Sequence, residues 1–194
     1  MKLNLGCSTD LRLPPWTNVD ISPRPREFPT VEYQQADLNS PWPWEDSSVD
    51  EIYAADIFEH IGDCQHHEVS DCEQCAGIQG FHNPELFRHW SGRIHVMNET
   101  WRVLKPGGRL AMICPDAAKG CGQWQDPTHV TPWTPNGLQY FDPGCPAWKR
   151  FHEAYGIVAR FRVLSVTERM YSEMADHVRC EVWKWTASLE AIKP

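Results

Sequence analysis

The stretch LNLGCSTDLRLPPWTNVDI at the start of the chain constrains the fold more than any other feature of the sequence. Its apolar runs predict two buried strands, Leu3–Gly6 and Thr17–Asp20, separated by only the ten residues Cys7–Trp16. The two prolines of the segment LPPW oppose a crossover helix in that connection. Ten extended residues span roughly 33 Å, which is enough to join neighbouring parallel strands. We therefore predict a strap without a helix between these two strands.

Two further strands are predicted, and an acidic residue follows each of them. Glu32–Ala36 is followed by Asp37, and Val49–Ala55 is followed by Asp56. In open parallel sheets the ligand binds outside the carboxyl ends of the strands. The polar residues at these points therefore predict one shared crevice.

The next predicted unit is a helix that leads into a strand. Asn83-Pro84-Glu85 offers an N-cap, a proline in the first turn and an acid, and apolar residues then recur at helical spacing as far as Leu104. The segment LKPGG ends the helix before a strand at Arg109–Cys114, with Lys105 as a cap and the glycines as a turn with positive φ. A helix and an antiparallel strand pair complete the prediction: Ala147–Ala159, Phe161–Met170 and Val178–Leu189. The predicted fold is α/β, with a doubly wound, mostly parallel sheet and an antiparallel C-terminal strand pair.

Composition limits the classes of partner. The 194 residues are 41% apolar, and no Gly/Ser-rich or single-charge stretch divides them, so we predict one domain over residues 1–194. Because 26 acidic residues outnumber 18 Lys and Arg, the net charge of −8 gives no general attraction to nucleic acid or to an anionic membrane. No apolar run has the length of a signal peptide or a membrane helix, so a cytoplasmic protein is expected.

Four segments, taken in order, resemble the class I S-adenosylmethionine-dependent methyltransferases, in particular small type-11-like members with a shortened first βα unit. They are LNLGC, NVDI, QADLNSPWPWEDSSVDEIYAADIFEHI and NETWRVLKPGGRLAMICP, so the resemblance covers Leu3 to about Cys114. It implies a Rossmann-like fold, S-adenosylmethionine as cofactor, and methyl transfer to an oxygen or nitrogen of a small or medium-sized acceptor. The predicted strap agrees with S-adenosylmethionine as the cofactor. A long helix behind Gly6 would favour a pyrophosphate through its dipole, and a turn without such a helix suits a cofactor that carries no pyrophosphate.

The resemblance also implies which residues hold the cofactor. In that family the glycine turn faces the methionine part, although Ser8 and Asp10 here replace the usual later glycines. Asp20 would accept hydrogen bonds from the ribose hydroxyls, and Asp37 would meet the adenine amino group. The alternatives are a solvated loop acid for Asp20 and a turn cap for Asp37. The predicted cofactor-binding residues are Gly6, Cys7, Ser8, Asp20, Ile21, Asp37, Leu38, Asp56 and Ile57.

The loop after the Arg109–Cys114 strand contains QDPTHVTPW, similar to the QDPTH-x-x-x-W segment of a methyltransferase subgroup. Asp126, His129 and Trp133 would there present an acid, an imidazole and an aromatic wall to the acceptor. His129 is the predicted general base, since an imidazole can take the proton of a hydroxyl near neutral pH, and Asp126 and His60 are the other catalytic candidates. Alternatively, Asp126 and His129 only shape the loop, and His60 is a core histidine.

Residues 62–82 form an insertion that is rich in cysteine and histidine. Cys64, His66, Cys72 and Cys75 have spacings that suit tetrahedral zinc, which would be structural because four protein ligands leave no open position. The alternative is a solvated lid with unpaired thiols.

We therefore predict an enzyme, a methyltransferase that uses S-adenosylmethionine, with a small-molecule acceptor as its partner. A nicotinamide-dependent oxidoreductase would need G-x-G-x-x-G leading into a helix and an acid about 20 residues further on. This chain has one glycine in the turn and fourteen residues from Gly6 to Asp20. The remaining alternative is a non-enzymatic binding or scaffold protein on the same fold, with a metal-binding Cys/His loop.

Overall fold

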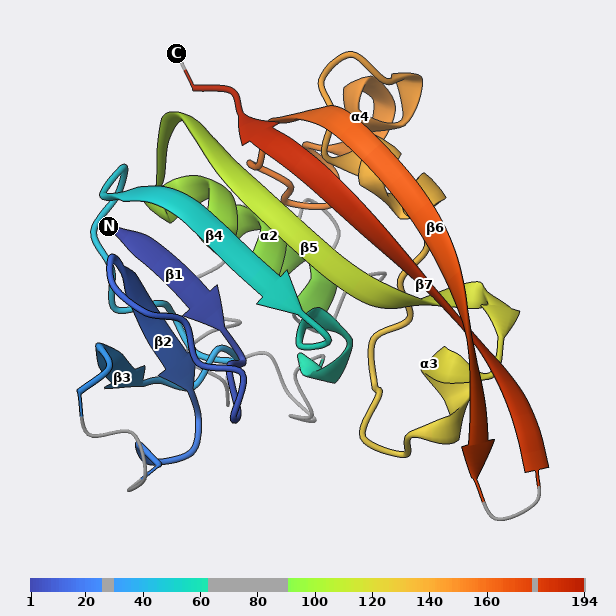
Figure 1. Ribbon diagram of the computed structural model, residues 1–194. Helices are drawn as coiled ribbons and strands as arrows, with labels where there is room; N and C mark the ends of the chain where they lie inside the picture. The colour runs from blue at the N-terminus through green and yellow to red at the C-terminus, as the bar shows by residue number, and fades with distance from the viewer. Residues whose placement is uncertain (26–29, 63–90, 176–177, 194) are drawn as a thin grey trace, which may run out of the picture.

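The computed structural model describes residues 1–25, 30–62, 91–175 and 178–193. In this part of the chain the strands form one seven-stranded sheet in the order β3-β2-β1-β4-β5-β7-β6 (Figure 1). Neighbours from β3 to β5 are parallel, whereas β7 runs antiparallel to both β5 and β6. The strands are β1 (Lys2–Leu5), β2 (Trp16–Asp20), β3 (Tyr33–Gln35), β4 (Val49–Ala55), β5 (Leu104–Gly120), β6 (Phe161–Ala175) and β7 (Val178–Ala191). The predicted α/β fold class is confirmed.

The connection from β1 to β2 contains no helix, as the sequence predicts. Two buried asparagines on the strands bind the strap instead. Asn18 accepts a hydrogen bond from the Arg12 N–H at 2.8 Å and donates one to the Arg12 carbonyl at 2.9 Å, and Asn4 donates to the Asp10 carbonyl at 2.8 Å. The Arg12 guanidinium lies 3.7 Å from the centroid of the Tyr53 ring. Side-chain amides thus satisfy backbone groups that a helix would satisfy internally.

The main described helix, α2 (Gly92–Val103), lies behind the sheet in Figure 1. The predicted start of this helix at Asn83 lies outside the described residues, and its end agrees with the prediction to within a residue. The other helical segments are η1 (Phe58–His60), α3 (Gly122–Gln125), η3 (Pro135–Tyr140) and α4 (Pro146–Phe151).

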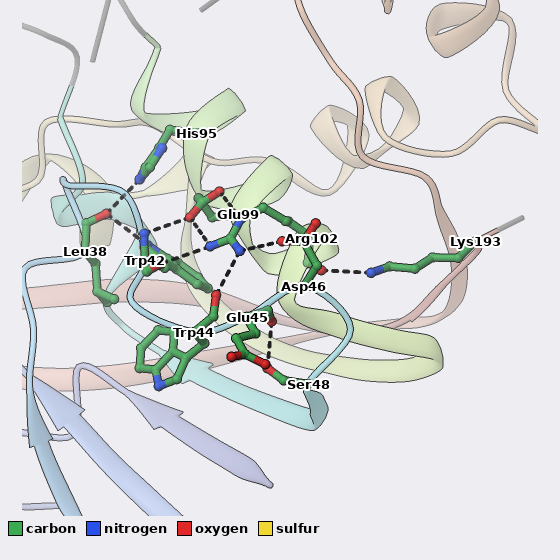
Figure 2. Close-up of polar contacts among 10 residues, drawn as sticks. All are labelled: Leu38, Trp42, Trp44, Glu45, Asp46, Ser48, His95, Glu99, Arg102 and Lys193. Atoms are coloured by element: carbon green, nitrogen blue, oxygen red, sulfur yellow. Dashed lines mark hydrogen bonds and ion pairs between the residues drawn. The ribbon is translucent and has the colours of Figure 1, made fainter. Parts of the chain in front are cut away.

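Figure 2 shows how α2 holds the loop that carries the sequence PWPW. Glu99 accepts a hydrogen bond from the Trp42 N–H at 2.7 Å. Arg102 donates to the carbonyls of Trp42 and Trp44 at 3.0 and 2.8 Å, and it also forms ion pairs with Glu99 and Asp46. Because Trp42 and Trp44 are buried, these tryptophans are core residues rather than the wall of a pocket.

The predicted helix Ala147–Ala159 is wrong beyond its first turns, because α4 ends at Phe151. The Asn98 side chain of α2 explains the early end. It donates to the Gly156 carbonyl at 2.9 Å and accepts from the N–H groups of Val158 and Ala159 at 3.0 and 3.1 Å. A side chain that bonds this backbone draws it out of a helical path.

The segment LKPGG ends α2, as predicted, but it forms the start of β5, which begins at Leu104 instead of Arg109; its pairing with β4 is irregular here, and Gly107 has a φ of +74°. Lys105 does not cap α2, however. Its ammonium group forms an ion pair with Asp50 at 2.7 Å, which fastens the turn to the start of β4.

Candidate functional site

A cavity of about 200 Å³ lies at the carboxyl ends of β1, β2, β3 and β4, and we call it the strand-end cavity. Six of the nine residues predicted to bind the cofactor line it, together with residues that sequence reasoning did not assign. Its lining consists of Gly6, Asp20, Ile21, Ala36, Asp37, Leu38, Asn39, Ile57, His60 and Ile61. The remaining three predicted residues, Cys7, Ser8 and Asp56, are not part of the lining. The structure thus gathers most of the predicted cofactor residues at one place, and their role as ligands stays a prediction.

The turn after β1 brings the backbone close to Ile57. Gly6 has a φ of +63°, and a Cβ atom at this position would lie 2.5 Å from the Ile57 Cγ1 atom. No other amino acid fits here without a shift, because both the backbone conformation and the available space require glycine. The close approach of Gly6 and Ile57 forms one wall of the strand-end cavity.

Asp20 is fixed by two backbone groups. The N–H of Ser8 donates to its Oδ2 atom and the N–H of Ser22 donates to its Oδ1 atom, both at 2.9 Å. Each carboxylate oxygen has a further lone pair, so the oriented side chain can accept hydrogen bonds from a ligand's hydroxyl groups. Ser8 therefore supports the site through its backbone while its side chain stays outside the cavity lining.

Asp37 caps a turn and also lines the strand-end cavity. Its Oδ1 atom accepts hydrogen bonds from the backbone and side-chain nitrogens of Asn39 at 2.9 and 3.1 Å. Asp37 therefore has the geometry of a turn cap and still lines the strand-end cavity. Leu38, which follows it, is held by His95, whose Nε2 lies 3.1 Å from the Leu38 carbonyl.

Cys7 belongs to the core beneath the turn. It is 3% exposed, and burial, the largest effect, together with the nearby Asp20 charge raises its pKa to about 11. A thiol with so high a pKa stays protonated and unreactive at neutral pH. Its role as a cofactor-binding residue stays a prediction.

A second cavity, of about 210 Å³, adjoins the first, and His60 lines both. We call it the charged cavity, because it is lined by Asp56, Glu59, His60, Pro115, Gly122, Gln125, Asp126, His129, Val182 and Lys184. It brings together all three predicted catalytic candidates, His129, Asp126 and His60. Sequence reasoning gave Glu59 no role of its own and missed Lys184 as a member of the site. Glu59 adjoins His60 in the sequence, which is a signal, whereas nothing in the sequence ties Lys184 of β7 to this place.

Hydrogen bonds join the two segments that supply this cavity, DIFEHI after β4 and QDPTHVTPW after β5. The N–H groups of Val130 and Thr131 both donate to the Glu59 carbonyl at 2.9 Å. The Trp133 indole donates to the Phe58 carbonyl at 3.1 Å, and the Thr131 hydroxyl donates to the Ile61 carbonyl. Trp133 is fully buried, so the expectation that it forms an aromatic wall for the acceptor is wrong. It is the core anchor that holds the loop in place.

The hydrogen bonds of both histidines are made by their Nδ1 atoms. His129 Nδ1 donates to the Gln123 carbonyl at 3.1 Å, because a carbonyl can only accept. The Thr128 hydroxyl donates to Asp126 at 2.6 Å and therefore accepts from His60 Nδ1 at 3.1 Å. In the neutral tautomer that these bonds select, each Nε2 carries a lone pair. The rings meet edge to face, with their centroids 4.7 Å apart.

Glu59 is the most unusual group in the charged cavity. Its side chain is fully buried, and within the described residues neither carboxylate oxygen meets the geometric criteria for a hydrogen bond, although the buried Cys114 thiol is close enough to act on its pKa. His129 Nε2 lies 3.9 Å from its Oε1 atom. Burial raises the pKa of Glu59 to about 8, and the neighbouring Asp56 charge adds to the increase. Such a strongly perturbed group in a cavity is typical of functional sites.

The other ionisable groups differ from Glu59 in having partners. Asp56, which has a φ of +50°, forms an ion pair with Lys184 at 2.7 Å. Hydrogen bonds from the Thr128 hydroxyl and backbone lower the pKa of Asp126. Burial first, and then the neighbouring His129 ring, lowers the pKa of His60, which favours its neutral form.

The predicted zinc ligands Cys64, His66, Cys72 and Cys75 all lie outside the described residues, as does the insertion from residue 63 onward. Zinc binding there stays a prediction. Among the helices of the described ranges, none has the length and apolar character needed to cross a membrane.

Comparison with known proteins finds similarity at the level of structure. No protein-family model matches the chain, and no curated protein sequence matches it. A SAM-dependent methyltransferase from Archaeoglobus fulgidus aligns with a TM-score of 0.53 at 11% identity, over 97% of this chain and 85% of that one. One from Methanosarcina mazei aligns with a TM-score of 0.53 at 14% identity, over 100% and 92%.

The [4+2]-cyclase SpnF also aligns, with a TM-score of 0.52 at 13% identity, over 100% of this chain and 74% of that one. Identities this low show the fold alone. The chain therefore has the fold of class I SAM-dependent methyltransferases, as its sequence predicts. Because a cyclase shares this fold, the activity has to be argued from the two cavities.

Proposed function

We propose that this chain is an S-adenosylmethionine-dependent methyltransferase that acts on a hydroxyl group of a small or medium-sized acceptor. One observation carries the proposal. Residues from the ends of four strands line one cavity, and this cavity shares His60 with a second cavity that holds the candidate catalytic residues. A cofactor and an acceptor must meet in this way for a group to pass between them. We take the chain to be a single domain working in the cytoplasm, as its sequence predicts.

The residues of the strand-end cavity fit the cofactor. Ile21, Leu38 and Ile57 offer apolar surface for an adenine ring, and Asp20 and Asp37 offer carboxylates for the ribose hydroxyls and the adenine amino group. The two adjoining cavities together reach the range of roughly 300 to 1,000 Å³ that is typical of small-molecule sites. The chain offers no helix N-terminus behind Gly6, which a dinucleotide's pyrophosphate would favour.

When bound, the cofactor supplies an electrophilic methyl group on a sulfonium. The protein's task is to orient an acceptor oxygen and to remove its proton. His129 Nε2 carries a lone pair, and the Asp126 carboxylate lies 3.7 Å from it, where it would stabilise the imidazolium that forms. General-base catalysis of this kind contributes about 10²- to 10⁴-fold to a rate. The acid and the imidazole therefore support proton removal in the charged cavity.

Calorimetric titration with S-adenosylhomocysteine tests the proposal. We expect one saturable site, and Asp20→Ala should weaken binding by about 1 to 3 kcal/mol, because an oriented hydrogen-bonding acid is lost. Glu153→Ala is the matched control, since this exposed acid lines neither cavity. If the folded protein binds no S-adenosylhomocysteine, the proposal fails in favour of a non-enzymatic binding protein on this fold.

A further inference from the structure

The charged cavity contains three groups of the kind that ligate metals. One ligand atom from each of Glu59, His60 and His129 lies within 4.8 Å of the others. Ligands held at about 2.1 Å from one ion at tetrahedral angles lie about 3.4 Å apart, so the widest separation in the cluster would need to shorten by up to about 1.4 Å when an ion binds. Two imidazoles and one carboxylate form a ligand set that leaves coordination positions open.

The buried Glu59 carboxylate is a second, independent observation that points to a ligand. It is fully buried, and within the described residues its only hydrogen-bonding side-chain neighbour is the weak donor Cys114, whose thiol does not meet the geometric criteria for a bond. Burying a carboxylate without a partner is costly, and a bound cation removes that cost. The ammonium group of Lys184 pairs with Asp56 and acts on Glu59 only through its charge. Three acids and one lysine line the charged cavity, so with Glu59 ionised the local charge favours a cation.

Hydrogen bonds orient both histidines for metal binding. The bond from His129 Nδ1 to the Gln123 carbonyl and the bond from His60 Nδ1 to Thr128 hold the rings through Nδ1, so Nε2 is the nitrogen that each ring can offer to a metal. Thr128 is itself held by Asp126, so His60 has the carboxylate-supported arrangement that is typical of metal-bound histidines. Partners of this sort around a metal site set the tautomer and orient the ring.

The loops that carry the ligands are joined without an ion. Two N–H groups of the His129 loop donate to the Glu59 carbonyl, and the buried Trp133 anchors the end of that loop to Phe58. The ligand atoms therefore come together through the fold itself. A site that is organised in advance loses little conformational freedom when it binds its ligand.

We propose that Glu59, His60 and His129 bind a divalent first-row transition-metal cation whose open positions face the charged cavity. This deepens the proposed function, on which its catalytic part rests. An acceptor hydroxyl bound to the ion loses its proton to water more readily, because a metal lowers the pKa of a bound O–H group. The oxygen then forms its bond to the methyl carbon as the carbon–sulfur bond breaks, which leaves a neutral thioether. His129 acts in this scheme as a ligand instead of a base.

Mn²⁺ titration of the EDTA-treated full chain tests the site. Mn²⁺ prefers oxygen and nitrogen to thiolate, so the Cys/His insertion interferes little, and a chain carrying both Cys72→Ser and Cys75→Ser controls for it. We expect one ion per chain in both proteins. Glu59→Gln and His129→Asn should each weaken binding about 10-fold or more, whereas Glu153→Gln should not change it. If Glu59→Gln does not fold, His129→Asn alone decides, since its loop is held by backbone bonds and Trp133.

Two results would overturn the metal site: no saturable Mn²⁺ binding, or binding that is the same in Glu59→Gln, His129→Asn and the wild type. Titration with S-adenosylhomocysteine in EDTA separates this failure from that of the proposed function. A protein that binds S-adenosylhomocysteine but no Mn²⁺ lacks the metal site and keeps the proposed function, with His129 as the proton acceptor.

Discussion

The strand-end cavity and the charged cavity meet at His60, yet they are built in different ways. The first is lined largely by residues at or just beyond the end of a strand, such as Gly6, Asp20 and Asp37. The second joins residues that are far apart in the chain, and its ion pair between Asp56 and Lys184 spans 128 positions. A cavity at strand ends can thus be predicted from local sequence, whereas the charged cavity exists only because separate loops are bonded together.

The largest expected effect is at Gly6, where strand-end geometry leaves no room. Gly6→Ala should destabilise the protein by about 2 to 5 kcal/mol, from a positive φ and from overpacking against Ile57. Binding of S-adenosylhomocysteine should be lost with it. Urea unfolding measures the first effect and calorimetry the second.

Gly107→Ala is the matched control. Gly107 also has a positive φ, of +74°, but a Cβ atom there would meet nothing within 4 Å. It should therefore cost only about 1 to 2 kcal/mol, from the backbone conformation. Equal losses in the two variants would mean that contact with Ile57 does not shape the strand-end cavity.

The next effect concerns the support of the same cavity from α2. Burial lowers the pKa of His95 from 6.5 to about 4, so the unfolded chain binds a proton at a higher pH than the folded one. The stability from a neutral His95 is complete above pH 6.5 and is lost as the pH falls towards 4. The loss amounts to about 3 kcal/mol at most.

His95→Gln should flatten this acid limb of the stability curve, since glutamine can still donate to the Leu38 carbonyl but does not titrate. Urea unfolding between pH 4 and 7 in both proteins checks the prediction. If the free energy of unfolding falls equally with pH in the variant and the wild type, then protonation of groups other than His95 causes the loss of stability.

The third effect separates the two cavities by function. His129→Asn should lower turnover of a hydroxyl acceptor by about 100-fold, which corresponds to about 2.7 kcal/mol in the activation barrier. The reason is that removal of the acceptor's hydroxyl proton is no longer assisted. The affinity for S-adenosylhomocysteine should change less than about twofold, since His129 does not line the strand-end cavity. His152→Asn is the control, because His152 stacks on Trp148 and lines neither cavity. A loss of affinity for S-adenosylhomocysteine in His129→Asn would show that cofactor binding and proton removal are not separated between the two cavities.

The predictions from sequence that were wrong all depend on contacts between distant segments, as the charged cavity does. Trp133 was expected at the surface of a site, but its indole is bonded within the core. The helix predicted after Ala147 ends early because Asn98 of α2 bonds the backbone that follows. Both errors come from contacts between segments more than fifty residues apart, which periodicity does not contain. For the same reason Lys105 was predicted to cap the helix that precedes it, whereas its ammonium group forms an ion pair with Asp50.

The sequence by itself determined the strands, the strap between β1 and β2, and the crevice at the strand ends. Prolines, apolar spacing and acids at strand ends act through local sterics and through the rule that parallel strands present their carboxyl ends together. Only the tertiary structure decided that Glu59 would be fully buried beside two histidines whose Nδ1 atoms are hydrogen-bonded. The physical reason is that burial and ring tautomers depend on which neighbours the fold supplies, and these neighbours come from β5, β7 and the loops that follow β4 and β5.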